Sequence, residues 1–293
     1  MNIVFHSTHF ERSEWQQAFT SLNTGIQLRD MDDIEMSDVD VLLVWKPGIT
    51  DWRAATNLQC VVWLGAGVDV TNTGLSLPPN TRQERLHDGG MREAMCDYAL
   101  YAVLHYQRRF DIFAQAQRQQ QWIHERDYRK KSDMSLGVLG FGHLGRAVAE
   151  YLASMGYCVS AWSRSARTSD SVVTYAGLDT LEHFLNQSPI LINMLPQTPE
   201  THHLLDETRL SQLPSHSALI SLSRGAVIDT QALLRLIDNG HLRGAFMDVF
   251  EQEPLSPSSP LWHHPNITMT PHQSAPTQVL DSAQEIAKLV AEI

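Results

Sequence analysis

The feature that most constrains the fold of this chain is a glycine turn between an apolar run and a helical segment. Residues 136–147, LGVLGFGHLGRA, place Gly140, Gly142 and Gly145 in the pattern Gly-x-Gly-x-x-Gly. The first glycine permits a tight turn, the second lets the backbone approach a phosphate, and the third lets the helix pack closely on its strand. Free amides at the start of the helix would then bind the anion. In this context the pattern predicts a dinucleotide pyrophosphate site rather than an ordinary glycine-rich turn.

The residues that follow the next predicted strand, 157–162, bear on the choice of dinucleotide. An acidic residue about 20 positions past the glycines normally binds the ribose of NAD. Ser163 stands near that position, and it is followed by Arg164, Ser165 and Arg167. Two guanidinium groups and two hydroxyls suit a 2′-phosphate, because arginine binds phosphate through a forked pair of hydrogen bonds. We therefore predict NADP(H) as the preferred cofactor and NAD(H) as a secondary one. The alternative is a solvated basic loop.

Short apolar runs alternate with helical patterns over most of the chain. In the second half the predicted strands are 136–140, 157–162, 190–194, 218–222, 244–249 and 267–270. The first half shows a weaker form of the pattern, with strands at 3–5, 41–44 and 61–64 and a helix over 11–22. This alternation predicts parallel sheets covered by helices on both faces. The expected fold class is α/β, with two Rossmann-like, doubly wound parallel-sheet domains and an active-site cleft between them.

Two further helical segments define the expected domains. Residues 91–124 have helical periodicity without proline and are expected to cross from one domain to the other. Residues 277–293 are amphipathic and are expected to return to the first domain. The prediction is a substrate-binding domain over 1–98 plus 275–293 and a dinucleotide-binding domain over 99–274.

A third helix is marked at both ends by residues with known end preferences. Thr230 is predicted to cap its start, because a threonine hydroxyl can accept a hydrogen bond from a first-turn amide. Gly240 is predicted to end it, because glycine adopts the left-handed conformation at low energy.

The charge and the cysteines exclude several classes of function. A formal net charge of −11 argues against a nucleic acid partner or an acidic membrane, so an anionic ligand must be held by a few local cations. The three cysteines lie far apart without metal-ligand spacing, which indicates reduced thiols and a cytoplasmic location. No apolar run approaches about 18 residues, and no basic leader precedes the first strand. We therefore expect no membrane span and no signal peptide.

Adjacent histidines occur twice, at His202 and His203 and at His263 and His264. Adjacent side chains rarely converge on one ion, and no carboxylate at a suitable spacing supports a site. The expectation is that the protein holds no metal.

Three later segments carry polar residues at the ends of predicted strands: SLSRGAVID (221–229), DVFEQEP (248–254) and TPHQSA (270–275). Together they supply a cation at Arg224, a carboxylate at Glu253 and an imidazole at His272. Reduction of a carbonyl by a nicotinamide needs an acid for the forming alkoxide, a cation for the substrate carboxylate and a partner that keeps the acid protonated. Taken singly each residue has an ordinary structural explanation, but the set matches these three needs.

With these segments in this order, the chain resembles the D-isomer-specific 2-hydroxyacid dehydrogenases. The resemblance covers nearly the whole length and rests on GFGHLG, NMLPQTPET, SRGAVID, GAFMDVFEQEP and TPH. LGAGVD at 64–69, the segment 91–98, RRFD at 108–111 and WSRS at 162–165 are most similar to the glyoxylate/hydroxypyruvate reductase A subgroup. One departure is Ser221, where the family usually has asparagine.

The resemblance implies a reductase of small 2-keto acids that converts glyoxylate to glycolate and hydroxypyruvate to D-glycerate. His272 would be the general acid, and Glu253 would orient the imidazole and favour its protonated form. Arg224 would bind the substrate carboxylate and polarise the keto oxygen. Asp248 would lie near the nicotinamide carboxamide.

The resemblance also implies a set of binding residues. Leu64 and the amides of Gly65, Ala66 and Gly67 would complete the carboxylate site, and Trp45 would form a substrate-side wall unless it is simply a buried strand-end aromatic. The cofactor would contact Gly140, Gly142, His143, Leu144, Gly145, Ser163, Arg164, Ser165, Arg167, Leu195, Pro196, Thr201, Leu222, Ser223, Asp248 and His272. The expected assembly is a homodimer.

Two other functions remain open. The chain could be a dehydrogenase of another D-2-hydroxy acid, or a dinucleotide-sensing protein without activity, since relatives of this fold act as transcriptional corepressors. The complete set of Arg224, Glu253 and His272 favours an enzyme. The sequence does not identify the physiological 2-keto acid.

Overall fold

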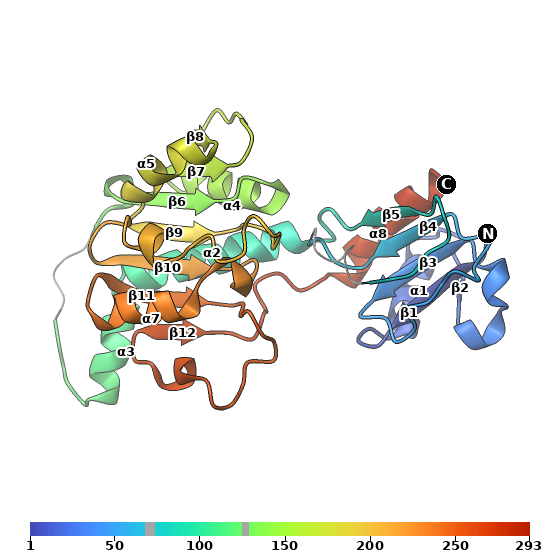
Figure 1. Ribbon diagram of the computed structural model, residues 1–293, viewed down its shortest axis with the longest axis horizontal. Helices are drawn as coiled ribbons and strands as arrows, with labels where there is room; N and C mark the ends of the chain where they lie inside the picture. The colour runs from blue at the N-terminus through green and yellow to red at the C-terminus, as the bar shows by residue number, and fades with distance from the viewer. Residues whose placement is uncertain (68–73, 125–128) are drawn as a thin grey trace. The chain divides into compact units, whose positions relative to one another are not determined.

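The protein is described by a computed structural model that covers residues 1–67, 74–124 and 129–293. It divides into two compact units (Figure 1). Unit 1 comprises Met1–Met91 and Pro276–Ile293, and unit 2 comprises Arg92–Ala275. The sequence-based division at 98/99 falls inside α2 (Met91–Gln107), a helix that continues without interruption through that point. Val68 and Asp69 of the predicted LGAGVD motif lie outside the described residues.

Unit 2 is built on a seven-stranded parallel sheet with the order β12-β11-β10-β9-β6-β7-β8. Its strands are β6 (Ser135–Leu139), β7 (Cys158–Ser163), β8 (Val173–Ala176), β9 (Ile190–Asn193), β10 (Ser217–Ser221), β11 (Leu242–Met247) and β12 (Ile267–Met269). The six strands predicted for this half are confirmed, each within two residues at both ends. The strand order reverses between β6 and β9, and ligands of such sheets bind beyond the carboxyl ends of the strands at that switch point.

Helices cover both faces of this sheet, as predicted for the α/β class (Figure 1). They are α2, α3 (Phe110–Arg118), α4 (His143–Ser154), α5 (Leu181–Asn186), α6 (Glu207–Leu210) and α7 (Thr230–Asp238). Short 3₁₀ turns are η4 (Lys131–Asp133), η5 (Leu178–Thr180), η6 (Gly225–Val227) and η7 (Pro260–His263). Within the described residues no helix is both long and apolar enough to span a bilayer.

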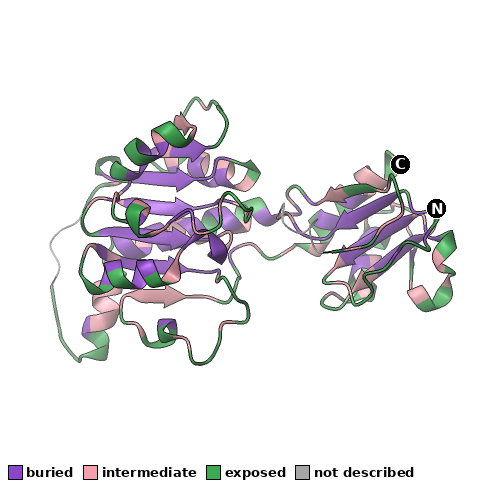
Figure 2. Cartoon of the chain, viewed as in Figure 1, coloured by how far each residue is buried: buried purple, intermediate pink, exposed green. Residues whose placement is uncertain are grey.

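The core of unit 2 follows the two-residue alternation of its strands. Along β9, Ile190 and Ile192 join the cluster packed under α2 and α4, whereas Leu191 joins the cluster packed under α5 and α7. Strands β6, β10 and β11 divide their side chains in the same way, so the central strands are buried on both faces (Figure 2). Near-continuous apolar runs are therefore required at these positions, which is why the sequence predicted the strands so closely.

Unit 1 has a five-stranded parallel sheet with the order β2-β1-β3-β4-β5, the other common doubly wound arrangement. Its strands are β1 (Ile3–Ser7), β2 (Leu28–Arg29), β3 (Val41–Trp45), β4 (Cys60–Trp63) and β5 (Arg82–Arg85). Its helices are α1 (Arg12–Ser21) and α8 (Val279–Ala291), with 3₁₀ turns η1 (Met31–Asp33) and η2 (Met36–Asp38). Helix α8 packs against α1 within unit 1.

The sequence did not reveal the strands β2, β5 and β8. Each lies at the edge of its sheet and exposes part of its surface. An edge strand pairs on one side only and tolerates polar side chains, as in the RQER sequence of β5. No apolar run marks such a strand in the sequence.

The helical stretch predicted over 91–124 forms two helices instead of one. Helix α2 ends at Gln107, and α3 begins at Phe110. Between them Arg109 has φ 62° and ψ 26°, a left-handed conformation that ends a helix and redirects the chain. Residues 119–124, which follow Arg118, are not helical.

The predicted cap of α7 is wrong by one residue. Thr230 is the first helical residue, and Asp229 is the N-cap. Oδ1 of Asp229 accepts hydrogen bonds from the amides of Gln231 at 2.9 Å and Ala232 at 3.1 Å. A carboxylate also interacts favourably with the positive end of the helix dipole, so aspartate is the stronger cap. Gly240, with φ 79°, follows the last turn as predicted.

We predict that Asp229→Ala lowers the free energy of unfolding by about 1 kcal/mol, because two first-turn amides lose their acceptor. Thr230→Ala is the matched control and should change it by less than about 0.5 kcal/mol. Urea denaturation followed by circular dichroism measures both. A larger loss in the Thr230 variant would show that the threonine is the cap.

Candidate active site

The loop from β6 to α4 has the backbone of an anion-binding turn. Gly140 has φ 112°, and a Cβ there would lie 2.7 Å from the carbonyl carbon of Met194. A Cβ at Gly145 would collide with the carbonyl oxygen of Gly140. Glycine is therefore required at both positions for α4 to approach the end of its strand.

The second glycine of the motif faces open space. A Cβ at Gly142 would meet no described atom within 4 Å, and Gly142 caps α4 without a hydrogen bond from a described side chain. First-turn amides of the helix have no partner within the helix itself and suit an anion. A backbone that leaves this space beside a helix start fits the pyrophosphate of a dinucleotide.

The end of β7 carries the residues predicted to select the cofactor. Ser163 is buried, and its hydroxyl donates a hydrogen bond of 2.8 Å to the carbonyl of Ser165, which shapes the turn. Arg164 and Arg167 are exposed. Hydrogen bonding from Thr198 lowers the pKa of Glu200, and the charge of Arg164 adds to this effect. Arg164 therefore lies near the turn that follows β9.

The turns after β9 and β10 are joined by hydrogen bonds between predicted cofactor residues. Oγ of Ser223 donates to the carbonyl of Leu195 at 2.6 Å. The Thr201 hydroxyl donates to the carbonyl of Pro196 at 2.7 Å and closes the turn. These residues, with Leu222, come together at the carboxyl edge of the sheet.

The predicted acid and its partner are in direct contact. Nδ1 of His272 lies 2.7 Å from Oε2 of Glu253, whose other oxygen accepts a hydrogen bond of 2.9 Å from the Phe250 amide. Partial burial acts to raise the pKa of Glu253, but these hydrogen bonds and the charges of His272 and Arg224 lower it on balance. The carboxylate therefore remains ionised beside the imidazole. With Nδ1 directed at Glu253, Nε2 is the ring nitrogen available to a ligand.

Arg224 lies close to this pair. It follows β10 immediately before the turn η6, is half-buried, and donates from Nη1 to the carbonyl of Ser223 at 2.7 Å. Its charge contributes to the lowered pKa of Glu253. The structure thus brings together Arg224, Glu253 and His272, which follow three neighbouring strands, β10, β11 and β12.

A buried carboxylate holds the loop that carries the histidine. Asp248 is fully buried, and Oδ1 accepts hydrogen bonds from Thr270 Oγ1 at 2.6 Å and from the Gln273 amide at 2.7 Å. Oδ2 accepts from the Ser274 amide at 2.7 Å. The His272 amide donates to the Asp248 carbonyl at 2.7 Å, and His272 itself has φ 56°. Asp248 therefore positions the histidine loop, while its predicted place beside the nicotinamide stays a prediction.

Sequence reasoning missed several residues that support this edge. Tyr98 contacts Thr270 through its hydroxyl and donates to Asp248 at 3.3 Å, and burial raises the pKa of Tyr98 to about 12. Asn193 donates to Ser221 at 3.2 Å and so ties β9 to β10. In the sequence, Asn193 stood at the end of an apolar run as the first residue of the family segment NMLPQTPET, but no role was assigned to it.

Unit 1 gathers its own predicted residues at the carboxyl ends of two strands: Trp45, Leu64, Gly65, Ala66 and Gly67. A Cβ at Gly65 would collide with the Trp45 ring, so the loop packs flat against the half-buried indole. Leu64 is fully buried, and the Ala66 carbonyl accepts a hydrogen bond of 2.6 Å from Arg85. Trp45 therefore supports the loop that carries Gly65, and part of its indole remains exposed.

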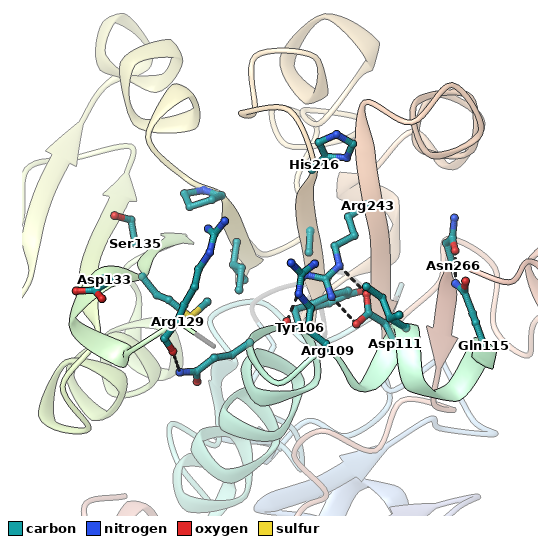
Figure 3. A pocket seen from close by; sticks show the side chains of 16 residues that line it. Tyr106, Arg109, Asp111, Gln115, Arg129, Asp133, Ser135, His216, Arg243 and Asn266 are labelled. Carbon is teal, nitrogen blue, oxygen red and sulfur yellow. Dashed lines mark hydrogen bonds and ion pairs between the residues drawn. The ribbon is translucent and has the colours of Figure 1, made fainter. Parts of the chain in front are cut away.

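A cavity of about 580 Å³ lies elsewhere in unit 2 (Figure 3). Its lining includes Ser135, Ile190, Ala218 and Arg243, at or next to the amino ends of four strands. Arg243 crosses it to form two hydrogen bonds with Asp111, at 2.6 and 2.5 Å. Because the predicted cofactor residues follow the carboxyl ends of the strands, this cavity is not part of the predicted site.

One premise of the sequence analysis does not hold. His202 and His203 do converge, and a carboxylate 48 residues beyond His203 joins them. Their Nε2 atoms lie 3.3 and 3.2 Å from the two oxygens of Glu251. The spacing along the chain gave no sign of this, because the contact is made by folding.

Comparisons with known proteins agree with this geometry. Residues 100–274 match the family model of the D-isomer specific 2-hydroxyacid dehydrogenase NAD binding domain. The whole chain is 36% identical, over 298 aligned residues, to glyoxylate/hydroxypyruvate reductase A from Enterobacter sp. (strain 638), covering 95% of that protein.

Two crystal structures are similar over almost the full chain. One is a D-isomer specific 2-hydroxyacid dehydrogenase from Xanthobacter autotrophicus Py2 in complex with NADPH and MES, with a TM-score of 0.93, 35% identity, and coverage of 99% of this chain and 94% of that one. The other is an NADPH-dependent glyoxylate/hydroxypyruvate reductase from Sinorhizobium meliloti in complex with NADP and sulfate, with a TM-score of 0.88, 28% identity and the same coverage. The chain therefore belongs to the D-isomer specific 2-hydroxyacid dehydrogenases, a family of oxidoreductases.

Proposed function

We propose that this protein reduces small 2-keto acids, such as glyoxylate and hydroxypyruvate, with NADPH as the preferred cofactor and NAD(H) as a secondary one. The observation that carries the proposal is the convergence of Arg224, Glu253 and His272 at the sheet edge that also carries the glycine turn. The names of the similar reductases support the substrate class.

The chemistry divides between groups at the carboxyl edge of the sheet. When bound, the reduced nicotinamide would supply a hydride to the carbonyl carbon. Arg224 would bind the substrate carboxylate and polarise the keto oxygen, since a guanidinium can hold a carboxylate with two parallel hydrogen bonds. His272 would donate a proton from Nε2 to that oxygen, and the product is the 2-hydroxy acid. Glu253 would stabilise the imidazolium and hold its plane through the 2.7 Å contact with Nδ1.

The cofactor would be held by three parts of unit 2. The amides at Gly142, His143 and Leu144 would bind the pyrophosphate. Arg164 and Arg167 would bind the 2′-phosphate together with the hydroxyls of the same turn. The remaining contacts would come from Leu195, Pro196, Thr201, Leu222, Ser223 and Asp248. The complexes of the similar proteins with NADPH and NADP support this choice.

For unit 1 we propose that the amides of Gly65, Ala66 and Gly67 bind the substrate carboxylate and that Trp45 contacts the substrate. The close packing of Gly65 on the Trp45 ring supports a loop of defined shape. We further propose a homodimer, on the family resemblance. The three free cysteines support a cytoplasmic location.

A panel of 2-keto acids assayed with both NADPH and NADH tests the proposed function directly. Preference for glyoxylate and hydroxypyruvate supports it, whereas a larger or branched 2-keto acid as best substrate would favour a different D-2-hydroxyacid dehydrogenase. Retained NADPH binding without turnover of any 2-keto acid would favour a dinucleotide sensor.

We predict that Arg164→Ala weakens NADPH binding by about tenfold or more, because a charge-assisted hydrogen bond contributes about 1.5–3 kcal/mol. NADH binding should hardly change, since NADH has no 2′-phosphate. Fluorescence titration of both cofactors measures this. Arg235→Ala is the matched control, because Arg235 is an exposed arginine of the same unit that pairs with Glu207. An equal loss for both cofactors would contradict the assignment.

We predict that His272→Gln lowers turnover of glyoxylate by about 10²–10⁴ with NADPH affinity retained, the range for loss of a general acid. Glu253→Gln should have a smaller effect on turnover and should change the pH profile. Reduction requires the protonated imidazole, and without the ionised carboxylate the imidazolium is less stable. The decline in kcat/KM with rising pH should therefore begin at lower pH.

Steady-state kinetics from about pH 5 to about pH 9 separate these roles, because this range spans the titration of an imidazole. An unchanged pH profile in the Glu253 variant would mean that this carboxylate is only structural. Full turnover in the His272 variant would show that the imidazole is not the general acid.

We predict that Arg224→Lys raises KM for glyoxylate and also lowers kcat. Lysine keeps the charge but loses the planar pair of donors that orients a carboxylate. Steady-state kinetics with glyoxylate, beside a direct NADPH titration, are the measurement. A variant that binds NADPH poorly but has normal substrate kinetics at saturating cofactor would place Arg224 in the dinucleotide site instead.

A further inference from the structure

Two imidazoles and a carboxylate meet at the surface of unit 2, apart from the residues proposed for catalysis. The rings of His202 and His203 are stacked, with centroids 4.1 Å apart and planes inclined by 24°. Both Nε2 atoms face Glu251, at 3.3 and 3.2 Å from its two oxygens. All three ligand atoms lie within 4.8 Å of one another.

The spacing between the histidine nitrogens and the glutamate oxygens is close to that of a metal coordination sphere. Zinc binds histidine nitrogen and carboxylate oxygen at about 2.0–2.2 Å, so neighbouring ligands of a tetrahedral ion are about 3.3–3.6 Å apart. The two nitrogen–oxygen distances are within about 0.1 Å of the lower end of that range. The two histidine nitrogens lie within 4.8 Å of each other in stacked rings, so one ion could replace the two hydrogen bonds once the rings turn toward a common point. Two histidines and one glutamate are also a ligand set that zinc uses in proteins.

The backbone holds the three ligands in place before any ion binds. The His203 amide donates to the carbonyl of Ala226 at 2.8 Å, and the His202 amide donates to that of Thr198 at 3.0 Å. A Cβ at Gly225, the residue before Ala226, would collide with the backbone between Phe250 and Glu251. Both ligand segments therefore pack on the turn η6, and an ion would not have to draw them together.

We propose that His202, His203 and Glu251 form a binding site for a divalent transition-metal ion, with Zn²⁺ as the best match. The side chains are 49%, 38% and 47% exposed, so an ion reaches them from solvent and water completes its coordination. The ion would link the turn after β9 to the segment after β11. The proposal does not depend on the proposed reductase activity.

Calorimetric titration of tag-free, metal-stripped protein with Zn²⁺ tests the site. The expected result is one ion bound per chain. His202→Ala and Glu251→Gln should each lower the affinity for Zn²⁺ by at least about tenfold. Loss of a group that hydrogen-bonds to a metal ligand already lowers metal affinity by about 10–100-fold, and loss of a ligand itself should cost no less. Co²⁺ gives a second readout, because its visible absorption reports the ligand set and should be lost in both variants.

The second histidine pair supplies the matched control. His264 pairs with Asp238 at 3.2 Å, and within the described residues no three-ligand group includes His263 or His264. His263→Ala should therefore leave the Zn²⁺ isotherm unchanged. The proposal is overturned if the wild-type protein binds no ion with saturation, or if His202→Ala and Glu251→Gln bind as the wild type does. Either result would leave the carboxylate as a hydrogen-bond acceptor for the two rings only.

Discussion

The carboxylate of Asp248 makes the interactions on which the candidate active site of unit 2 depends. Asp248 is fully buried directly after β11, and its oxygens accept hydrogen bonds from the segment after β12. The donors are the amides of Gln273 and Ser274 and the hydroxyl of Thr270. Hydrogen bonds to a charged group contribute about 1.5–3 kcal/mol each, and an unsatisfied buried carboxylate would be strongly destabilising. The loop that carries His272 is therefore held at a defined position, including the left-handed conformation of the histidine itself. The imidazole meets Glu253 because this loop is held.

The order of the strands explains why these groups share one edge. The sheet is parallel, so the carboxyl ends of β9, β10, β11 and β12 point the same way, and the order reverses beside β6. The glycine turn follows β6, and Arg224 and His272 follow β10 and β12. This edge therefore carries an arginine, an imidazole with its carboxylate, and a helix start with open space beside it. The chain as a whole has a net charge of −11. Local placement of cations, rather than overall charge, is what would give this edge an affinity for anions.

The turn η6 connects this edge to the histidine pair on the surface. Gly225 follows Arg224 directly, and its lack of a side chain lets Phe250 and Glu251 approach the turn. The next residue, Ala226, accepts the hydrogen bond that holds His203. The amide of Phe250 also donates to Glu253. One close backbone contact therefore places residues of two separate groups, the proposed acid pair and the proposed metal ligands.

Much of the fold could be read from the sequence, because central strands and glycine turns leave local marks. A strand buried on both faces needs a continuous apolar run, and a left-handed turn or a close helix contact needs glycine, so β6, β9 and the turn at Gly140 were predictable. Edge strands such as β5 carry no such mark, and the cap of α7 is Asp229 rather than the predicted Thr230 beside it. The residue types at Arg224, Glu253 and His272 came from the sequence and the family it resembles. Only the tertiary structure decided that these three side chains lie close together. It also decided that Asp248 is buried among groups that include Tyr98 and Ser274, and that Glu251 approaches two histidines. These are contacts between residues 19 to 150 positions apart, and hydrogen bonding over such separations leaves no periodic pattern in a sequence.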